Sequence, residues 1–202
     1  MKLPFIKDVP FKMPYTTTNI IGLLVNRLTD FMKDVPSNRP IVVVCIGTDR
    51  STGDALGPLT GTSLLKYRSS HFHLYGTLEE PVHAMNLEDT LIAINHKHIK
   101  PFIIGIDACL GQVSSVGCIQ VGEGPVRPGA GVNKDLPPVG DIHVTGIVNV
   151  GGFMEYFVLQ NTRLHLVMRL SEIIATSLFT AIANHIHISS TARDQTAASD
   201  HS

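Results

Sequence analysis

Two patterns of apolar residues alternate along the chain. The stretches "IVVVCIG" (41–47) and "FIIGIDA" (102–108) are continuous apolar runs rich in β-branched residues, which is typical of strands that are buried on both faces. Elsewhere the apolar residues recur every three or four positions, as they do on one face of a helix. This spacing predicts helices over 16–35, 56–68 and 84–98, and one or two helices over 153–186.

Weaker strand patterns complete the order of elements. They lie at 73–78, 114–122 and 142–150, and the segment between the last two is rich in Gly and Pro, which predicts a long loop. Strands that alternate with helices predict the α/β class, here a three-layer α/β/α fold with a mostly parallel sheet. We expect a single domain over 1–187, with an N-terminal helical extension over about 1–38, and a disordered polar tail over 188–202.

Composition and charge limit the possible binding partners and the cellular compartment of the protein. The 202 residues are 44% hydrophobic and 16% charged, so much of the chain must be buried in a core or in an oligomer interface. A net charge of −1 gives no basic field that would attract nucleic acid or an anionic membrane. The N-terminus has no continuous apolar region like that of a signal peptide, and "IIATSLFTAIANHI" is too short to span a bilayer. Three cysteines without a Cys-x-x-Cys motif fit a reducing compartment, so we expect a cytoplasmic protein.

Three carboxylates follow the two buried strands. Asp49 and Asp54 lie in the loop after the 41–47 strand, and Asp107 closes the 102–108 strand. In parallel α/β sheets the ligand site lies beyond the carboxyl ends of the strands, so these side chains could converge on one cleft. Two neighbouring carboxyls cannot both ionise easily, and one of them retains a proton. The pair then offers a base that activates water and an acid that protonates a leaving group, as hydrolysis of an amide requires.

Structural roles and nucleotide binding are the first alternatives. Asp54 could cap the following helix, and Asp107 could bind backbone amides in a turn. The glycines of the first loop lack the spacing and the lysine of a phosphate-binding loop. Pro125 and Pro128 prevent the helix that a dinucleotide fingerprint must open. We therefore expect no nucleotide cofactor.

Histidine and cysteine chemistry stays open as a further alternative. Most histidines occur as i, i+2 pairs, which point to different faces of a helix, whereas His83 and His143 stand alone. A histidine together with Asp54 and Asp107 could hold a metal, although we expect none. Cys109 could be a nucleophile, but such a cysteine is more often an inert core residue. The i, i+2 histidine pairs mentioned above are His71/His73, His96/His98 and His185/His187.

Longer motifs carry a resemblance to a known family. "GTDRSTGDALGP", "IDACLG" and "RPGAGVNKDLPPVGDIHVTGIVNVGGFMEY" are similar to the germination protease of spore-forming bacteria, and the match is closer to the smaller YyaC-type sporulation proteins. The resemblance runs from about Ile41 to the C-terminal helix. It implies the phosphorylase/hydrolase-like fold that the protease shares with hydrogenase maturation proteases. The chain is shorter than the protease and differs from it at Asp49 and Cys109, so neither autoprocessing nor tetrameric assembly is implied.

The resemblance also implies a function and a set of site residues. The two essential aspartates of the protease correspond by motif to Asp54 in "DALGP" and Asp107 in "DAC". We therefore expect a peptidase of sporulation that acts on peptides or proteins, with small acid-soluble spore proteins as candidate substrates. The apolar excess and the helical C-terminus of the chain lead us to expect a homo-oligomer, a dimer. The alternatives are a non-catalytic binding or assembly protein and a metal-dependent maturation-type protease. The residues expected to bind substrate are Asp49, Arg50, Arg127, Gly129, Gly131 and Asn133.

Overall fold

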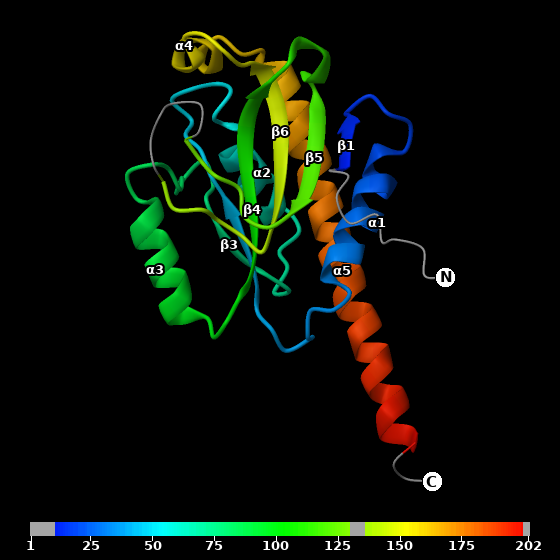
Figure 1. Ribbon diagram of the computed structural model, residues 1–202. Helices are drawn as coiled ribbons and strands as arrows, with labels where there is room; N and C mark the ends of the chain where they lie inside the picture. Colours follow the sequence, from blue (N-terminus) through cyan, green and yellow to red (C-terminus); the bar gives the residue numbers. More distant parts are fainter. Residues whose placement is uncertain (1–10, 130–135, 200–202) are drawn as a thin grey trace, which may run out of the picture.

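The computed structural model describes residues 11–129 and 136–199, with side chains described as far as residue 188. Within these residues the chain forms one six-stranded sheet and five α-helices (Figure 1), which confirms the α/β class. The strands are β1 (Phe11–Pro14), β2 (Ile41–Cys45), β3 (His73–Tyr75), β4 (Phe102–Gly111), β5 (Cys118–Glu123) and β6 (Ile142–Val150). The helices are α1 (Ile20–Met32), α2 (Leu56–Leu65), α3 (Leu87–Lys97), α4 (Glu155–Gln160) and α5 (Leu164–Ser199), and a 3-10 turn covers Val113–Ser115.

The sheet is mixed, and three of its five strand pairings are parallel, in line with the prediction of a mostly parallel sheet. Its strand order is β1-β5-β6-β4-β2-β3. The strands β3, β2, β4 and β6 run parallel, whereas β5 and β1 add two antiparallel pairings at one side. Parallel neighbours need a crossover of a dozen or more residues. The connection from β4 to β5 is shorter than that, so β5 returns in the opposite direction.

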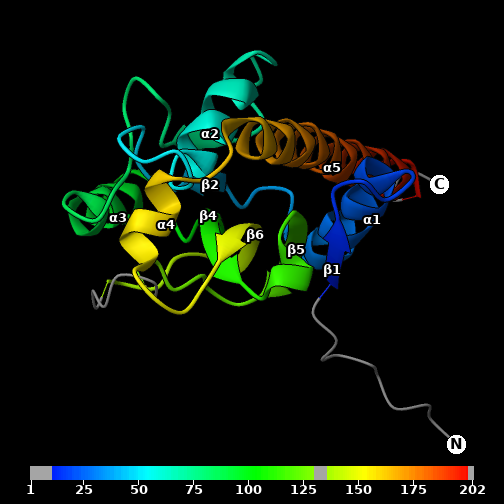
Figure 2. The same cartoon turned by 90° about the horizontal axis from the view of Figure 1, so that it is seen from above.

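Helices cover both faces of the sheet, and this explains why every residue of β2 is apolar. Successive side chains of a strand point to opposite faces. Ile41 and Val43 pack in the core formed with α1, α2 and α5, whereas Val42 and Val44 pack in a second core with α3. Figure 2 shows α2 and α5 together over one face of the strands. The three layers predicted from the alternation of strands and helices are therefore present.

Several predicted boundaries are corrected by the structure. The N-terminal segment contributes the strand β1 in addition to the helix α1, because residues 11–14 find a partner in β5. Residues 114–115 belong to the 3-10 turn, and β4 extends three residues beyond its predicted end at 108. The region predicted as a tail continues α5 to Ser199. That stretch contains no Gly or Pro, so nothing in its sequence interrupts the helix; residues 200–202 lie outside the described part.

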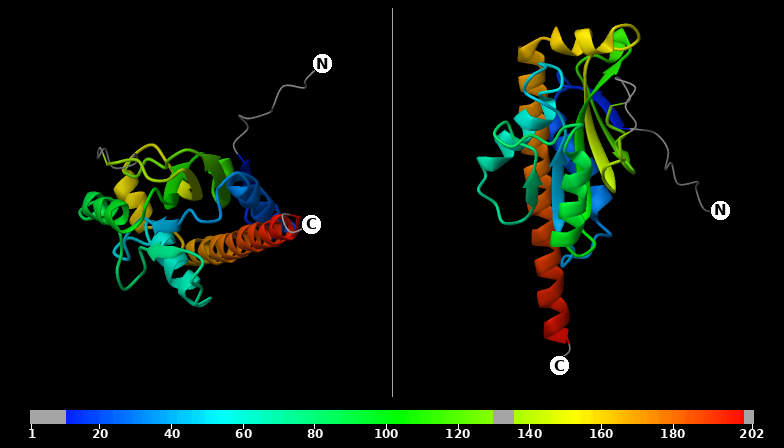
Figure 3. Two further views of the ribbon diagram at one scale, coloured as in Figure 1. Left: turned by 90° about the horizontal axis from the view of Figure 1, so that it is seen from below. Right: turned by 90° about the vertical axis from the view of Figure 1, so that its left-hand side faces the viewer.

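The helix α5 is the longest element and packs into the core. Its stretch Leu164–Ile188 is long and apolar enough to cross a membrane, judged by length and composition alone. This stretch is longer than "IIATSLFTAIANHI", the apolar segment identified in the sequence analysis. However, 56% of its most apolar window is buried inside the protein, where it packs with α1 and α2. This is how the core helix of a soluble protein packs. The C-terminal part of α5 continues beyond the body of the domain (Figures 1 and 3).

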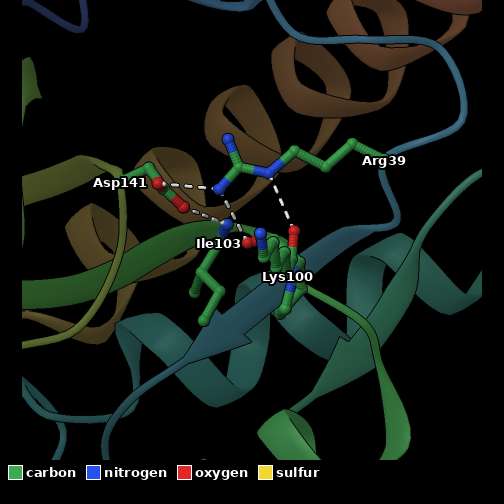
Figure 4. A network of polar contacts seen from close by, with 5 residues as sticks. Arg39, Lys100, Ile103 and Asp141 are labelled. Atoms are coloured by element: carbon green, nitrogen blue, oxygen red, sulfur yellow. Dashed lines mark hydrogen bonds and ion pairs between the residues drawn. The ribbon is translucent and has the colours of Figure 1, made fainter.

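A polar clamp joins the amino ends of three strands, at the end of the sheet that is opposite α4 (Figure 4). The Arg39 guanidinium donates to the carbonyl oxygens of Lys100 and Pro101, each at 2.9 Å, and to Asp141 Oδ1 at 3.0 Å. The other carboxylate oxygen of Asp141 accepts the N–H of Ile103 at 2.7 Å. The clamp therefore holds the entries of β2, β4 and β6 together and leaves their carboxyl ends free for a site.

Candidate active site

The strands β2 and β4 end at different levels, and this opens the sheet between them. Their pairing stops at Cys45↔Ile106, whereas β4 continues to Gly111 with β6 as its partner. Asp107 therefore lies inside β4, opposite Thr145, and not at the strand end that the sequence predicted. The register of β4 also shifts between Cys109 and Leu110. Such irregularities in strands are common beside functional sites because they redirect side chains.

A cavity of about 690 Å³ occupies this opening, at the carboxyl ends of the strands, where the sequence placed the ligand site. Its walls come from the loop after β2, the segment before α3, the extended part of β4, the segment after β5, and α4. The cavity brings together six of the eight predicted site residues: Asp49, Arg50, Asp54, Asp107, Arg127 and Gly129. The other two, Gly131 and Asn133, lie outside the described residues.

Asp54 is held on a tight loop between β2 and α2. Thr48 donates its backbone N–H to the Asp54 carbonyl oxygen at 3.2 Å. A side chain at Gly47, where φ is +143°, would overlap that same oxygen, so glycine is required there. The residue that caps α2 is Ala55, and no side-chain hydrogen bond caps the helix. The Asp54 carboxyl therefore does not act as the helix cap that was the structural alternative, and burial raises its pKa.

Asp107 is the more deeply buried of the two carboxyls, with 9% of its surface exposed. Its Oδ1 accepts the N–H of Ala108 at 2.8 Å, so the structural alternative of a backbone amide partner is correct for one oxygen. That bond lowers the pKa, but burial and the negative charge of Asp54 outweigh it. The pKa of Asp107 is accordingly well above its ordinary value. The charge of Asp54 thus favours the protonated form of Asp107.

Two further polar side chains, Ser51 and His83, line the cavity and have a polar atom available for a ligand. Ser51 is 5% exposed, and its buried Oγ has no hydrogen-bond partner within the described structure. His83 accepts the N–H of Met85 at Nδ1, at 3.3 Å. Because Nδ1 is occupied by this contact, Nε2 is the ring nitrogen left for a ligand. His143, the other single histidine considered as a metal ligand, contacts the Gly124 carbonyl oxygen through Nδ1 at 2.9 Å and does not line the cavity.

Cysteine and metal chemistry receive no support from the geometry. Cys109 lines the cavity, but burial raises its pKa to about 11 despite a hydrogen bond with Thr145, so it is a neutral thiol near pH 7. Among the side chains of residues 11–129 and 136–188, no three His, Cys, Asp or Glu residues are grouped so that they could hold a metal ion. Two histidines that do meet in space, His73 and His98, belong to two different i, i+2 pairs, and their ring centroids lie 4.1 Å apart.

The sequence reasoning missed one whole wall of the cavity. Glu155, Tyr156 and Leu159 reach it from α4, and Met85 reaches it from the segment before α3. These contacts join parts of the chain that are far apart in sequence, and the segment 153–186, predicted as one or two helices, gave no sign that its first part would face a cavity. A usable signal was "GGFMEY", in which two glycines precede a cluster of aromatic residues.

Two comparisons with known proteins found matches that cover most of the chain. A family model described as "Protein of unknown function (DUF1256)" matches residues 12–177. The protein named "Uncharacterized protein YyaC" from Bacillus subtilis (strain 168) is 61% identical over 142 residues, which cover 70% of this chain and 69% of that protein. The expected similarity to YyaC-type proteins is confirmed. The β2–α2 loop, β4 and α4 all lie within the matched family region.

Proposed function

The chain belongs to the DUF1256 family, and we propose that it is a peptidase that hydrolyses amide bonds with water activated by Asp54 and Asp107. One observation carries the proposal. Both carboxyls line the same cavity, and the charge of Asp54 raises the pKa of Asp107. Pairs of carboxyls whose surroundings separate their proton affinities are suited to acid–base catalysis.

The direction and cause of the two pKa shifts assign one carboxyl as the acid and the other as the base. Asp107 has the more strongly raised pKa and keeps its proton, so it is the acid, while Asp54 is the base. Asp54 takes a proton from water as the water oxygen bonds to the amide carbon. Asp107 then gives its proton to the nitrogen as the carbon–nitrogen bond breaks. The proton on Asp54 returns to Asp107 through solvent, so that one water molecule is consumed for each bond cleaved.

The remaining walls fit a peptide. Apolar side chains surround the two carboxyls, which limits water and supports their raised pKa values. We assign Arg50 and Arg127 to the binding of substrate carbonyl or carboxylate oxygens, and Asp49 to orientation at the mouth of the cavity. Gly129 allows a peptide backbone to approach closely; Gly131 and Asn133, which lie outside the described residues, are proposed to bind substrate from the sequence alone. The larger aliphatic side chains of the lining are Ile46, Met85, Leu110, Val126, Leu136 and Leu159.

The biological setting is also part of the proposal. The motifs "TGDALGP", "IDA" and "PGAGV" resemble the germination protease, which supports a phosphorylase/hydrolase-like fold and a role in the cytoplasm of the sporulating cell or spore. Small acid-soluble spore proteins are the first substrates to test. We expect the chain to act as a homodimer, and sedimentation of the purified protein would measure this.

The test is hydrolysis of purified small acid-soluble spore proteins, followed by mass spectrometry. Asp54→Asn and Asp107→Asn should each lower the rate by about 10²–10⁴-fold, the usual contribution of an acid or base. Asp30→Asn, at an exposed position on α1, is the matched control and should retain the full rate. Unchanged cleavage in either cavity variant would remove that residue from the mechanism.

A second candidate is a non-catalytic binding or assembly protein that keeps the fold. It is favoured by the large apolar side chains that α4 exposes to solvent beside the cavity. This candidate predicts no hydrolysis of any spore protein by the wild-type chain, together with a stable complex that survives gel filtration. The metal-dependent alternative lacks a preformed group of ligands in the described part of the chain.

A further inference from the structure

A cluster of exposed apolar side chains lies at the start of α4. Four of the five residues 153–157 are large and apolar, and each exposes more than half of its surface. Soluble proteins rarely expose contiguous apolar patches of this kind unless they bind something. The four residues, called the α4 surface from here on, are Phe153, Met154, Tyr156 and Phe157.

Folding of the domain does not explain the α4 surface. Leu159 is the buried residue of α4 and packs in the main core. On the protein side, Asn149 Nδ2 donates to the carbonyl oxygen of Val158 and to Thr162 Oγ1, each at 3.2 Å. These contacts fix the inner side of the helix. The aromatic side chains at 153, 156 and 157 are therefore left for solvent or for a partner.

The α4 surface is continuous with the cavity. Tyr156 belongs to both, because it lines the cavity and is 63% exposed. Met85, also an exposed apolar side chain, lines the cavity from the segment before α3. The backbone N–H of Gly53, next to Asp54, donates to the carbonyl oxygen of Leu159 at 2.8 Å. The same short helix thus touches the solvent-exposed patch, the cavity and the loop of Asp54.

We infer that the α4 surface is the docking site for apolar segments of an unfolded polypeptide substrate, one part of which enters the cavity. The inference rests on the proposed function and adds the class of substrate. An extended chain can lay apolar side chains on Phe153 and Phe157 while its backbone passes Tyr156 toward Asp54. The segment Phe153–Phe157 carries one charged residue, Glu155, so its chemistry selects apolar segments and not acidic or basic ones.

The test is binding of fluorescently labelled β-casein, an unstructured polypeptide with apolar segments, to the full chain that carries Asp54→Asn to prevent cleavage. Adding Phe153→Ser and Phe157→Ser should weaken binding at least tenfold, since two large apolar contacts are lost. Ile99→Ser is the matched control and should bind casein normally. It removes a side chain that is 86% exposed, against 85% for Phe153, between α3 and β4 and away from the cavity lining. The single variant Phe157→Ser replaces the double variant if the latter does not fold.

Kinetics separate this inference from the proposed function. With Asp54 intact, the double variant should raise the KM for casein and leave kcat for a short peptide unchanged. If Asp54→Asn does not slow hydrolysis, the aspartate mechanism fails, while the binding result still reports on the α4 surface. Casein affinity that changes less than twofold in the double variant overturns the docking inference. A wild-type dimer that dissociates in the double variant, with casein affinity unchanged, overturns it in favour of a second copy of the chain.

Discussion

Gly53 donates its backbone N–H to the carbonyl oxygen of Leu159 at 2.8 Å. This bond joins the loop of Asp54 to α4, two segments more than 100 residues apart in the sequence. A Cβ atom at Gly53 would lie 2.7 Å from Leu159 Cδ2 and 3.0 Å from the Leu159 carbonyl oxygen. The position of α4 over the cavity therefore depends on the absence of a side chain at residue 53.

Gly53→Ala should displace α4 from the Asp54 loop. We expect a loss of about 1–3 kcal/mol in the free energy of unfolding, the usual range for overpacking, and faster amide exchange in α4. Gly151→Ala is the comparison variant, because its Cβ would meet its nearest neighbour at 3.3 Å, a milder overlap than the 2.7 Å at Gly53. Equal stability of the two variants in urea would contradict the proposed coupling.

Asp107→Asn should flatten the dependence of stability on pH. The pKa of Asp107 in the folded chain is well above its ordinary value because the carboxyl is buried beside Asp54, so between the unfolded and the folded pKa the folded state binds a proton that the unfolded state has released. Stability from this group is therefore present below the unfolded pKa and is lost as pH rises through the folded pKa, by about 1.4 kcal/mol per pH unit. Asparagine does not ionise, so the variant should be more stable than wild type at pH 8 and should lose less on going from pH 4 to pH 8. Urea unfolding across this range measures it, and a variant curve parallel to that of wild type would contradict it.

Ser51→Ala and Ser115→Ala should have opposite effects. Both serines are buried, but Ser51 Oγ has no partner in the described structure, whereas Ser115 Oγ accepts a hydrogen bond from Lys12 Nζ at 3.1 Å. Removing an unpaired buried hydroxyl should stabilise the protein by about 1 kcal/mol, and removing the paired one should destabilise it by about 1–2 kcal/mol. Thermal unfolding of the two variants tests this. A loss of stability in Ser51→Ala would mean that its hydroxyl has a partner in solution.

Two variants of Asp141 can separate the contribution of the ion pair to stability from that of the backbone hydrogen bond. Asp141→Ala loses both the Arg39 ion pair and the acceptor for the Ile103 N–H, and should cost about 1–2 kcal/mol. Asp141→Asn keeps an oxygen for Ile103, and a partly exposed ion pair contributes about 0–1 kcal/mol, so this variant should be closer to wild type. Chemical denaturation in low and high salt distinguishes the two contributions. Equal losses in the two variants would show that the ion pair dominates.

The sequence was informative where local pattern decides structure. The β-branched run of β2 indicated a strand buried on both faces, and Val42 and Val43 do pack on opposite faces. The rule that sites lie at the carboxyl ends of strands placed Asp54 and Asp107 together, and both line the cavity. The catalytic roles of the two residues remain a prediction.

Features that depend on distant parts of the chain could not be predicted. β1 is a strand because β5 offers it a partner, not because "FKMP" has a strong strand pattern. The extension of β4 to Gly111 depends in the same way on β6. The α4 wall of the cavity depends on the close approach of Gly53 to Leu159, which no periodicity in either segment encodes.

The two outermost strands are the shortest in the sheet, with four residues in β1 and three in β3. In addition, Pro14 in β1 has no backbone N–H to offer a neighbour. Within the described residues, little unpaired backbone is thus available along either border, which is a common protection against edge-to-edge joining of sheets. Fibril growth by strand addition from the native state is therefore disfavoured, and concentrated solutions of the folded chain should remain clear.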